Sequence, residues 1–292
     1  MTHWEPSSEY QKVAEANRQF YAGAASLYDA SETCVTDRRV QKRLEADLDQ
    51  IITMFGRKPE TIRALDACGG AGNVSLKLLD RGLDVTLADI SPELLEIYRR
   101  KCADSGFAVR NVCAEIGSFL SQTNQMFDLI VFSSALHHLE NIERVLTLAF
   151  HRLQPEGLLY TVFDPTSRSQ LQATTRLLLR LEYLTFKLLF QTRDLPAASL
   201  RRLSRLFSGV SASRKSDAVL SHATAGMLAE FHVENGIDDL ALEAELGAVG
   251  FEVVWHQRYA DCRFDLTRRL IERTGDSTAF KLLLRKPAQK PI

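Results

Sequence analysis

The sequence lacks the cysteine pattern of a disulfide-bonded or zinc-binding protein. Its five cysteines are odd in number and scattered, and none forms a Cys-x-x-Cys pair. This argues against a disulfide framework or a bound metal and favours reduced thiols. The amino terminus has neither the basic nor the apolar stretch of a signal peptide, and no apolar run approaches the roughly 18 residues of a membrane span. We therefore expect a cytoplasmic protein without a metal site.

The chain also lacks a net charge of either sign. Its 36 Lys and Arg and 37 Asp and Glu leave a formal net charge of -1, so composition gives no general reason to expect nucleic-acid binding. The charge is unevenly distributed, because residues 166–217 contain ten Lys or Arg and three Asp or Glu. This basic segment is expected to differ in its role from the rest of the chain.

Apolar runs alternate with helical patterns, which predicts an α/β fold with a doubly wound, mostly parallel sheet of seven strands. Strands are expected at residues 62–67, 84–89, 107–112, 127–132, 158–163, 251–257 and 279–284. Helical spacing predicts helices over 10–29, 38–55, 72–81, 142–153 and 238–249. A further helix should start at Pro92 after a capping Ser91, and Pro155–Gly157 should form a turn.

The alternation is interrupted after residue 165, which predicts an inserted helical segment. Four regions follow: N-terminal helices over 1–58, a core over 59–165, a helical cap over 166–222 between strands five and six, and the rest of the core sheet over 223–292. A second helix of the cap is expected near Pro196, and residues 208–216 should form a loop.

A glycine-rich loop follows the first predicted strand. The strand ends near Asp66, and Gly69, Gly70 and Gly72 come directly after it. Such a loop lets the backbone approach a ligand closely. The next strand also ends in an acid, Asp89. Two acid-ended strands around a glycine loop indicate a nucleotide-type cofactor site at the carboxyl edge of a parallel sheet.

The residues of this loop discriminate between cofactors. Asn73 follows the last glycine, so the Gly-Lys-Ser/Thr of a phosphate loop is absent, and Ser75 stands where a dinucleotide fingerprint has its third glycine. Asp66 would repel a pyrophosphate but would favour a cofactor with an ammonium and a sulfonium. The two carboxylate oxygens of Asp89 match a ribose diol. S-adenosyl-L-methionine has all of these groups.

With these residues the chain resembles the class I S-adenosylmethionine-dependent methyltransferases, especially the small-molecule group that includes ubiquinone/menaquinone-type enzymes. Residues 66–72, Asp-Ala-Cys-Gly-Gly-Ala-Gly, resemble the family pattern Asp-x-Gly-x-Gly-x-Gly, with Cys68 in place of the first glycine. Residues 87–92, 127–139 and 153–158 resemble later motifs, and Glu156 departs from the last of them. The resemblance covers residues 60–165 well, covers the last two strands weakly and says nothing specific about the cap. It implies a Rossmann-like methyltransferase fold.

The resemblance also implies a set of cofactor-binding residues. Cys113 stands where the family most often has an acid, so adenine contacts are assigned to the backbone of Ala114 and to Glu115. Residues 21–29 resemble the helix that closes over the cofactor, and Tyr21 or Tyr28 would donate to the methionine carboxylate; ordinary helix packing is the alternative. The expected set is Tyr21, Tyr28, Asp66, Cys68, Gly69, Gly70, Gly72, Asp89, Ile90, Ala114, Glu115 and Ser133.

Two adjacent histidines are the candidate catalytic residues. His137 and His138 follow the fourth strand, at the edge that faces the transferred methyl group in this fold. An imidazole can deprotonate a phenol or an activated carbon acid, but paired histidines can also cap the next helix. Asp164 is a second candidate base or a turn cap. No Asn-Pro-Pro-Tyr type motif is present, which argues against adenine or glutamine nitrogen as the acceptor.

The cap has several possible roles. Its apolar face could line a cavity for a hydrophobic or anionic acceptor, form a homodimer interface, contact a lipid surface peripherally with its arginines at the headgroups, or simply pack on the domain. We expect an S-adenosylmethionine-dependent methyltransferase that acts on oxygen or carbon of a small, hydrophobic molecule and does not bind nucleic acid. The alternatives are a nicotinamide-dependent oxidoreductase and a non-catalytic module that binds the cofactor.

Overall fold

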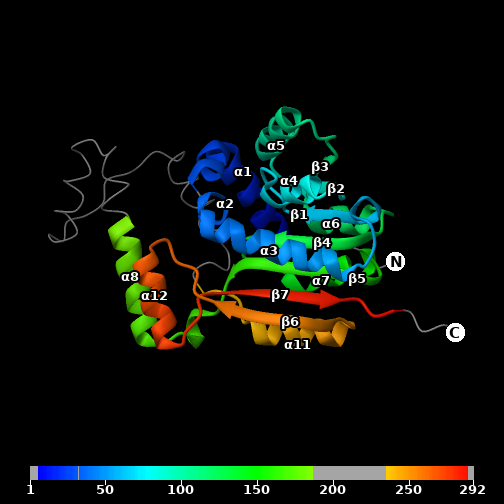
Figure 1. Ribbon diagram of the computed structural model, residues 1–292. Coiled ribbons are helices and arrows are strands. Elements are labelled where there is room, and N and C mark those ends of the chain that lie inside the picture. Colours follow the sequence, from blue (N-terminus) through cyan, green and yellow to red (C-terminus); the bar gives the residue numbers. More distant parts are fainter. Residues whose placement is uncertain (1–5, 32, 187–234, 289–292) are drawn as a thin grey trace.

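The computed structural model describes residues 6–31, 33–186 and 235–288 of the chain. Seven strands form one sheet in the order β3-β2-β1-β4-β5-β7-β6 (Figure 1). They are β1 (Arg63–Ala67), β2 (Asp84–Asp89), β3 (Asn111–Cys113), β4 (Phe127–Ser133), β5 (Leu153–Pro165), β6 (Glu252–Tyr259) and β7 (Ala279–Arg285). Strands β1 to β5 pair in parallel, and β7 is antiparallel to both β5 and β6. The predicted mostly parallel, seven-stranded sheet is confirmed.

Helices cover both faces of this sheet. They are α1 (Ser8–Ser31), α2 (Thr33–Thr36), α3 (Arg38–Met54), α4 (Asn73–Asp80), α5 (Pro92–Ser105), α6 (Ile116–Gln122), α7 (Ile142–Arg152), α8 (Ala173–Phe186), α11 (Asp239–Val249) and α12 (Asp265–Thr274). Side chains alternate along β4, so Ile130 packs in a cluster with α6, α7 and α11 whereas Leu129 packs with α3 and α4. The fold therefore has three layers, with a helical layer on each side of the sheet.

The ends of several helices follow from local sequence. The Ser91 hydroxyl accepts a hydrogen bond from the backbone N–H of Leu94 at 3.2 Å, with Pro92 in the first turn of α5. The same helix ends at Gly106, whose φ of 72° is left-handed. The Phe107 N–H then bonds back to the Cys102 carbonyl at 2.9 Å. Phe107 thus belongs to the end of α5, and the strand predicted to begin there starts only at Asn111.

Two further expectations were wrong at the level of individual elements. The predicted turn Pro155–Gly157 lies inside β5, which begins at Leu153 and is irregular at its start, with Glu156 left-handed at a φ of 63°. Helices α6 and α12 were not predicted. The first has only seven residues, and the second is dominated by charged side chains, so neither produces a long apolar period.

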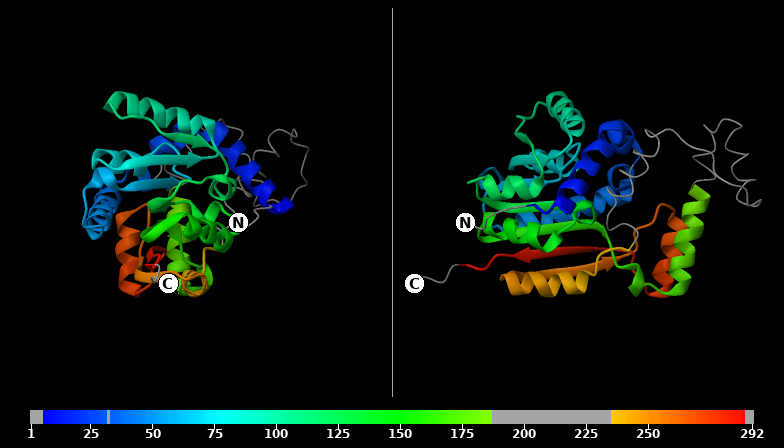
Figure 2. Two further views of the ribbon diagram at one scale, coloured as in Figure 1. Left: turned by 90° about the vertical axis from the view of Figure 1, so that its right-hand side faces the viewer. Right: turned by 180° about the vertical axis from the view of Figure 1, so that it is seen from behind.

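Helices α8 and α12 pack together and extend beyond the carboxyl edge of the sheet, as Figures 1 and 2 show from different sides. Helix α8 begins the predicted cap. The second cap helix near Pro196 and the loop over 208–216 lie outside the described residues. Within the residues that the structure describes, no helix is long and apolar enough to cross a membrane. The four-region division of the chain stays a prediction.

Candidate functional site

A cavity opens at the carboxyl edge of the sheet, where the strand order reverses. Strand β1 lies between β2 and β4, so the chain leaves β1 and β4 toward opposite sides of the sheet. Such a switch point leaves a crevice between the two departing loops. Residues that follow β1, β2, β3 and β4 line the cavity, and α1 supplies a further wall.

The glycine loop forms one side of this cavity. Cys68, Gly70 and Gly72 all have left-handed backbone, with φ of 57°, 53° and 82°. A left-handed Cys is strained, and strain of this kind collects at ligand sites. Gly69 has no room for a side chain, because a Cβ there would lie 2.6 Å from Cγ of Asp66. The loop can therefore pass over Asp66 only with glycine at position 69.

Asp66, beneath this loop, has one carboxylate oxygen without a hydrogen-bond partner. Its side chain is fully buried, and its Oδ2 accepts hydrogen bonds from the Ser75 N–H at 2.9 Å and the Ser75 hydroxyl at 2.7 Å. Its Oδ1 has no hydrogen-bond partner. Burial raises the pKa of Asp66 to about 6, against the lowering effect of the Ser75 hydrogen bonds. A buried carboxylate oxygen without a partner is costly, and a cationic ligand would relieve this cost.

Asp89 is the second acid at the cavity wall. Its Oδ2 accepts from the Gly70 N–H and its Oδ1 from the Ser91 N–H, both at 2.8 Å. Burial raises the pKa of Asp89 to about 6, although these backbone donors oppose the rise. Each carboxylate oxygen can accept more than one hydrogen bond. Asp89 therefore organises the glycine loop and keeps acceptor capacity for a hydroxyl-bearing ligand.

Helix α1 lies along the cavity and is tied to two of the loops. The Tyr10 hydroxyl donates to the Glu115 carboxylate, and the Asn17 amide donates to the His138 carbonyl at 3.1 Å. The Tyr21 hydroxyl is 3.2 Å from Nε2 of His138. Glu115, predicted to contact adenine, also caps α6 by accepting from two backbone N–H groups. The side chain of Tyr28 lies outside the described residues.

The two candidate histidines have different surroundings. His138 lines the cavity, whereas His137 does not. The His137 ring is buried, with Nδ1 at 2.9 Å from Asp164 Oδ1, and its backbone N–H donates to the same oxygen. A bulge at Phe163, with a left-handed φ of 66°, brings Asp164 to this turn. Burial raises the pKa of Asp164 to about 7, against the hydrogen bonds from the His137 backbone and its neighbours. His137 and Asp164 thus hold the turn that presents His138.

The structure brings most of the predicted residues to one cavity. Those at its wall are Tyr21, Asp66, Cys68, Gly69, Gly70, Asp89, Ile90, Ala114, Glu115, Ser133 and His138. Gly72 is not among them: it caps α4, where a Cβ would lie 2.2 Å from the Tyr98 ring. The sequence interpretation missed Tyr10, Val13 and Asn17, which also line the cavity. These residues and Tyr21 are spaced three or four positions apart, which places them on one face of a helix. This spacing was the sequence signal that could have identified them.

These residues fit S-adenosylmethionine. The unpartnered Asp66 oxygen suits an ammonium group, and the second acid, Asp89, suits a diol. The side chains of Val13, Ile116 and Leu139 add apolar wall for a flat base. The negative charge at the strand ends matches a cofactor with two positive groups and opposes the pyrophosphate of a nicotinamide dinucleotide.

Comparison with known proteins agrees with this fit. Residues 64–157 match the family model described as a methyltransferase domain. Over this segment the chain is similar to the class I S-adenosylmethionine-dependent methyltransferases. It is 30% identical over 126 residues to the ubiquinone biosynthesis O-methyltransferase of Sinorhizobium fredii, covering 40% of this chain and 50% of that one.

Two further similar proteins are named for different methyl acceptors. The tRNA 5-carboxymethoxyuridine methyltransferase of Escherichia coli is 28% identical over 125 residues, 42% of this chain and 47% of the relative. The chain thus spans about half the length of these curated relatives. The magnesium protoporphyrin IX methyltransferase of Synechocystis, solved with bound SAH, has a TM-score of 0.55 at 14% identity and covers 94% of this chain and 99% of its own. That likeness shows the shared fold.

Proposed function

We propose that this protein transfers the methyl group of S-adenosylmethionine to an oxygen or carbon atom of a small, hydrophobic molecule. One observation carries the cofactor half of this proposal: Asp66 Oδ1 is buried without a partner beside a glycine loop, at the wall of a cavity. When bound, S-adenosylmethionine supplies a methyl group on a positively charged sulfur, which makes that carbon electrophilic. The protein must then bind the cofactor and the acceptor, align the acceptor atom with the methyl group and the sulfur, and exclude water from the site.

The cofactor-binding roles are divided between the two acids and α1. Asp66 would accept from the ammonium group through Oδ1, and Asp89 would accept from the ribose hydroxyls. Glu115 fixes the start of α6 and the hydroxyl of Tyr10, so it shapes the adenine side of the cavity. The residues of α1 at the cavity wall would shield the site from water.

His138 is the proposed general base. It lines the cavity, and its Nε2 lies within hydrogen-bond reach of the Tyr21 hydroxyl. A base is needed only when the acceptor atom carries a proton, as in a phenol or an activated carbon acid. His138 would take that proton, and Tyr21 would orient the ring. The His137–Asp164 pair would hold the backbone turn that follows β4 and carries His138.

The proposed class of acceptor rests on the charge of the chain and on the name of one relative. The chain has a formal net charge of -1, which disfavours a nucleic-acid substrate, and one relative is named for ubiquinone biosynthesis. Another relative is named for a tRNA nucleoside, so RNA is the acceptor class to test against. We also propose a cytoplasmic location. The cysteines of the described residues are free thiols, which is consistent with a reducing compartment.

The experiment follows the label from methyl-tritiated S-adenosylmethionine in a cell extract. After incubation with the purified protein, the extract is separated into organic-soluble, RNA and protein fractions. We expect enzyme-dependent label in the organic-soluble fraction. Label confined to RNA or protein would refute the small-molecule acceptor, and failure of calorimetric titration to detect cofactor binding would refute the methyl donor.

Variants separate binding from chemistry. His138→Gln should keep its affinity for S-adenosylmethionine within about threefold and lose about 100-fold or more in turnover, because it removes proton abstraction. His151→Gln is the matched control, since His151 is exposed on α7 and does not line the cavity. Equal turnover in the two variants would exclude His138 as the base.

A further inference from the structure

Helix α8 exposes an apolar stripe on its outer side. Leu177, Leu181 and Leu184 follow one another at helical spacing, and each is more than half exposed, at 56%, 51% and 54%. The opposite side of the helix packs inward, where Thr175 is buried and Leu178 is partly buried. Helix α8 packs against α12, so its inner side already has a partner. Contiguous exposed leucines on a helix that is already packed on one side mark an interaction surface.

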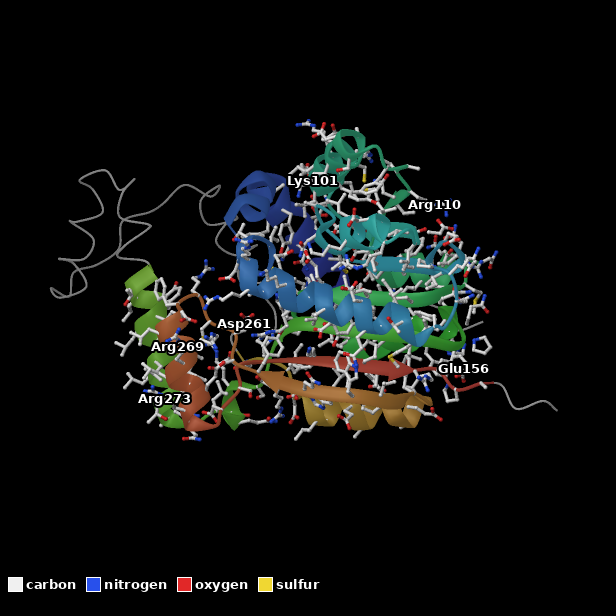
Figure 3. The ribbon with its side chains drawn as sticks, in the orientation of Figure 1. Lys101, Arg110, Glu156, Asp261, Arg269 and Arg273 are labelled. Atoms are coloured by element: carbon white, nitrogen blue, oxygen red, sulfur yellow. The ribbon has the colours of Figure 1, made fainter. Side chains whose placement is uncertain are left out.

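Two arginines of α8 lie along one side of this stripe. Arg176 and Arg180 are exposed on the same helix, one turn apart. The acid of α8, Glu182, turns inward and accepts from the Phe264 N–H at 2.7 Å. Figure 3 shows Arg269 and Arg273 along the neighbouring α12; Arg269 also pairs with an acid of its own helix. The outer side of α8 therefore has arginines but no acidic side chain among the described residues.

The stripe is separate from the cofactor cavity but lies at the same edge of the molecule. No residue of α8 lines that cavity. The α8–α12 pair extends beyond the carboxyl edge of the sheet, clear of the body of the domain (Figures 1 and 2). Among the described residues, nothing outside the α8–α12 pair stands between the outward leucines of α8 and a flat surface.

We infer that the outer side of α8 binds the surface of an anionic lipid bilayer. The three leucines of the stripe would enter the boundary between headgroups and acyl chains, and the arginines would lie at the level of the phosphates. The sequence after α8 is also basic, with seven Lys or Arg and two Asp or Glu in residues 187–217. A stable dimer buries roughly 800 Å² per partner, which three side chains on one convex helix do not supply. This inference is independent of the proposed methyl transfer.

Vesicle flotation of the full chain tests it. Wild-type protein should float with vesicles of phosphatidylcholine and phosphatidylglycerol, should not float with phosphatidylcholine alone, and should be released by salt. Leu184→Ser should lower the bound fraction severalfold, and the triple change at 177, 181 and 184 should abolish binding. Leu240→Ser is the matched control, because Leu240 is 55% exposed on α11, beside acidic rather than basic residues.

Charge-reversal variants test the contribution of the arginines in the same vesicle experiment. Arg180→Glu should weaken binding to anionic vesicles severalfold, whereas Arg100→Glu, at an exposed position of α5, should not. Unchanged S-adenosylmethionine binding and thermal unfolding would show that each variant is folded. The inference is overturned if the protein fails to float, if the α8 and control variants lose binding equally, or if sedimentation shows a dimer that Leu184→Ser dissociates. It is also overturned if Leu184→Ser lowers the melting temperature as a buried leucine would, because the stripe would then be covered within the protein itself.

Discussion

Replacing Asp66 with Asn removes a buried negative charge and keeps the shape of the side chain. The Asn oxygen can still accept from the Ser75 N–H and hydroxyl, which now bond to Asp66 Oδ2. The Asn amide then takes the place of the unpartnered Oδ1. We expect this variant to be more stable than the wild type at neutral pH and to lose most of its affinity for S-adenosylmethionine.

The size and sign of the stability change follow from the pKa. Burial raises the pKa of Asp66 from 3.8 to about 6, and one pKa unit corresponds to about 1.4 kcal/mol. The folded state therefore holds the proton more tightly than the unfolded state. The destabilisation is absent below the unfolded pKa, grows as pH rises, and reaches about 3 kcal/mol above the folded pKa. A new unpartnered amide offsets part of the gain at every pH, so the net stabilisation should be about 1–3 kcal/mol at neutral pH and about 2 kcal/mol lower at about pH 4.

Urea unfolding of both proteins across this pH range measures the effect, with the m-value serving to check that the denatured states are comparable. Asp104→Asn is the control, because Asp104 is exposed on α5 and its replacement should change little at any pH. A variant that is destabilised at neutral pH, or a gain that does not depend on pH, would refute the reasoning about the buried charge. Unchanged cofactor affinity would refute the binding role of Asp66.

Three further predictions concern the same loop and the distant side of the sheet. Affinity for S-adenosylmethionine should be present above about pH 6 and be lost as pH falls through that value. Asp66 and Asp89 both have pKa values of about 6; Asp66 must be ionised to bind the ammonium group, and protonation of Asp89 removes acceptor capacity for the ribose hydroxyls. Titrations that do not depend on pH would contradict this. Gly69→Ala should cost about tenfold or more in cofactor affinity, since its Cβ would lie 2.6 Å from Cγ of Asp66, and calorimetry would detect it. Lys281→Met should destabilise the protein by about 3–5 kcal/mol in urea unfolding. It leaves the buried Asp47 carboxylate, now 2.6 Å from Lys281 Nζ, without its charged partner and with only the Tyr160 hydroxyl, at 2.7 Å, as a donor among these side chains. Adding Asp47→Leu should recover most of this loss, and a double variant as unstable as the single one would count against the explanation.

Much of the core could be read from local pattern. The strands before and after the glycine loop, the cap at Ser91 and the two acids at the strand ends all depend on neighbouring residues, since strand period, helix caps and turn chemistry are local properties. The seven-stranded sheet with its parallel core follows from the order of these elements. The predicted boundary of a strand was wrong where pairing with a neighbouring strand lengthened it. This happens at the start of β5, where Leu153 pairs with Phe127.

The candidate site depended more on tertiary structure. His137 and His138 are adjacent and chemically alike, so no sequence pattern could tell them apart. The bulge at Phe163 brings Asp164 against His137 and leaves His138 at the cavity. The helical spacing could place Asn17 on one face with Tyr21, but its hydrogen bond to the His138 carbonyl exists only because α1 packs on the turn after β4. Such contacts join residues that are far apart in the chain.

The sequence by itself determined the parallel core and the methyl-donor loop, because apolar periodicity, helix caps and the acid-glycine spacing act over a few residues. Only the tertiary structure decided which histidine faces the cavity, that Tyr10, Val13 and Asn17 of α1 join its wall and that α8 turns its leucines outward. The physical reason is that side-chain burial depends on what packs across from each element, and that partner lies elsewhere in the sequence.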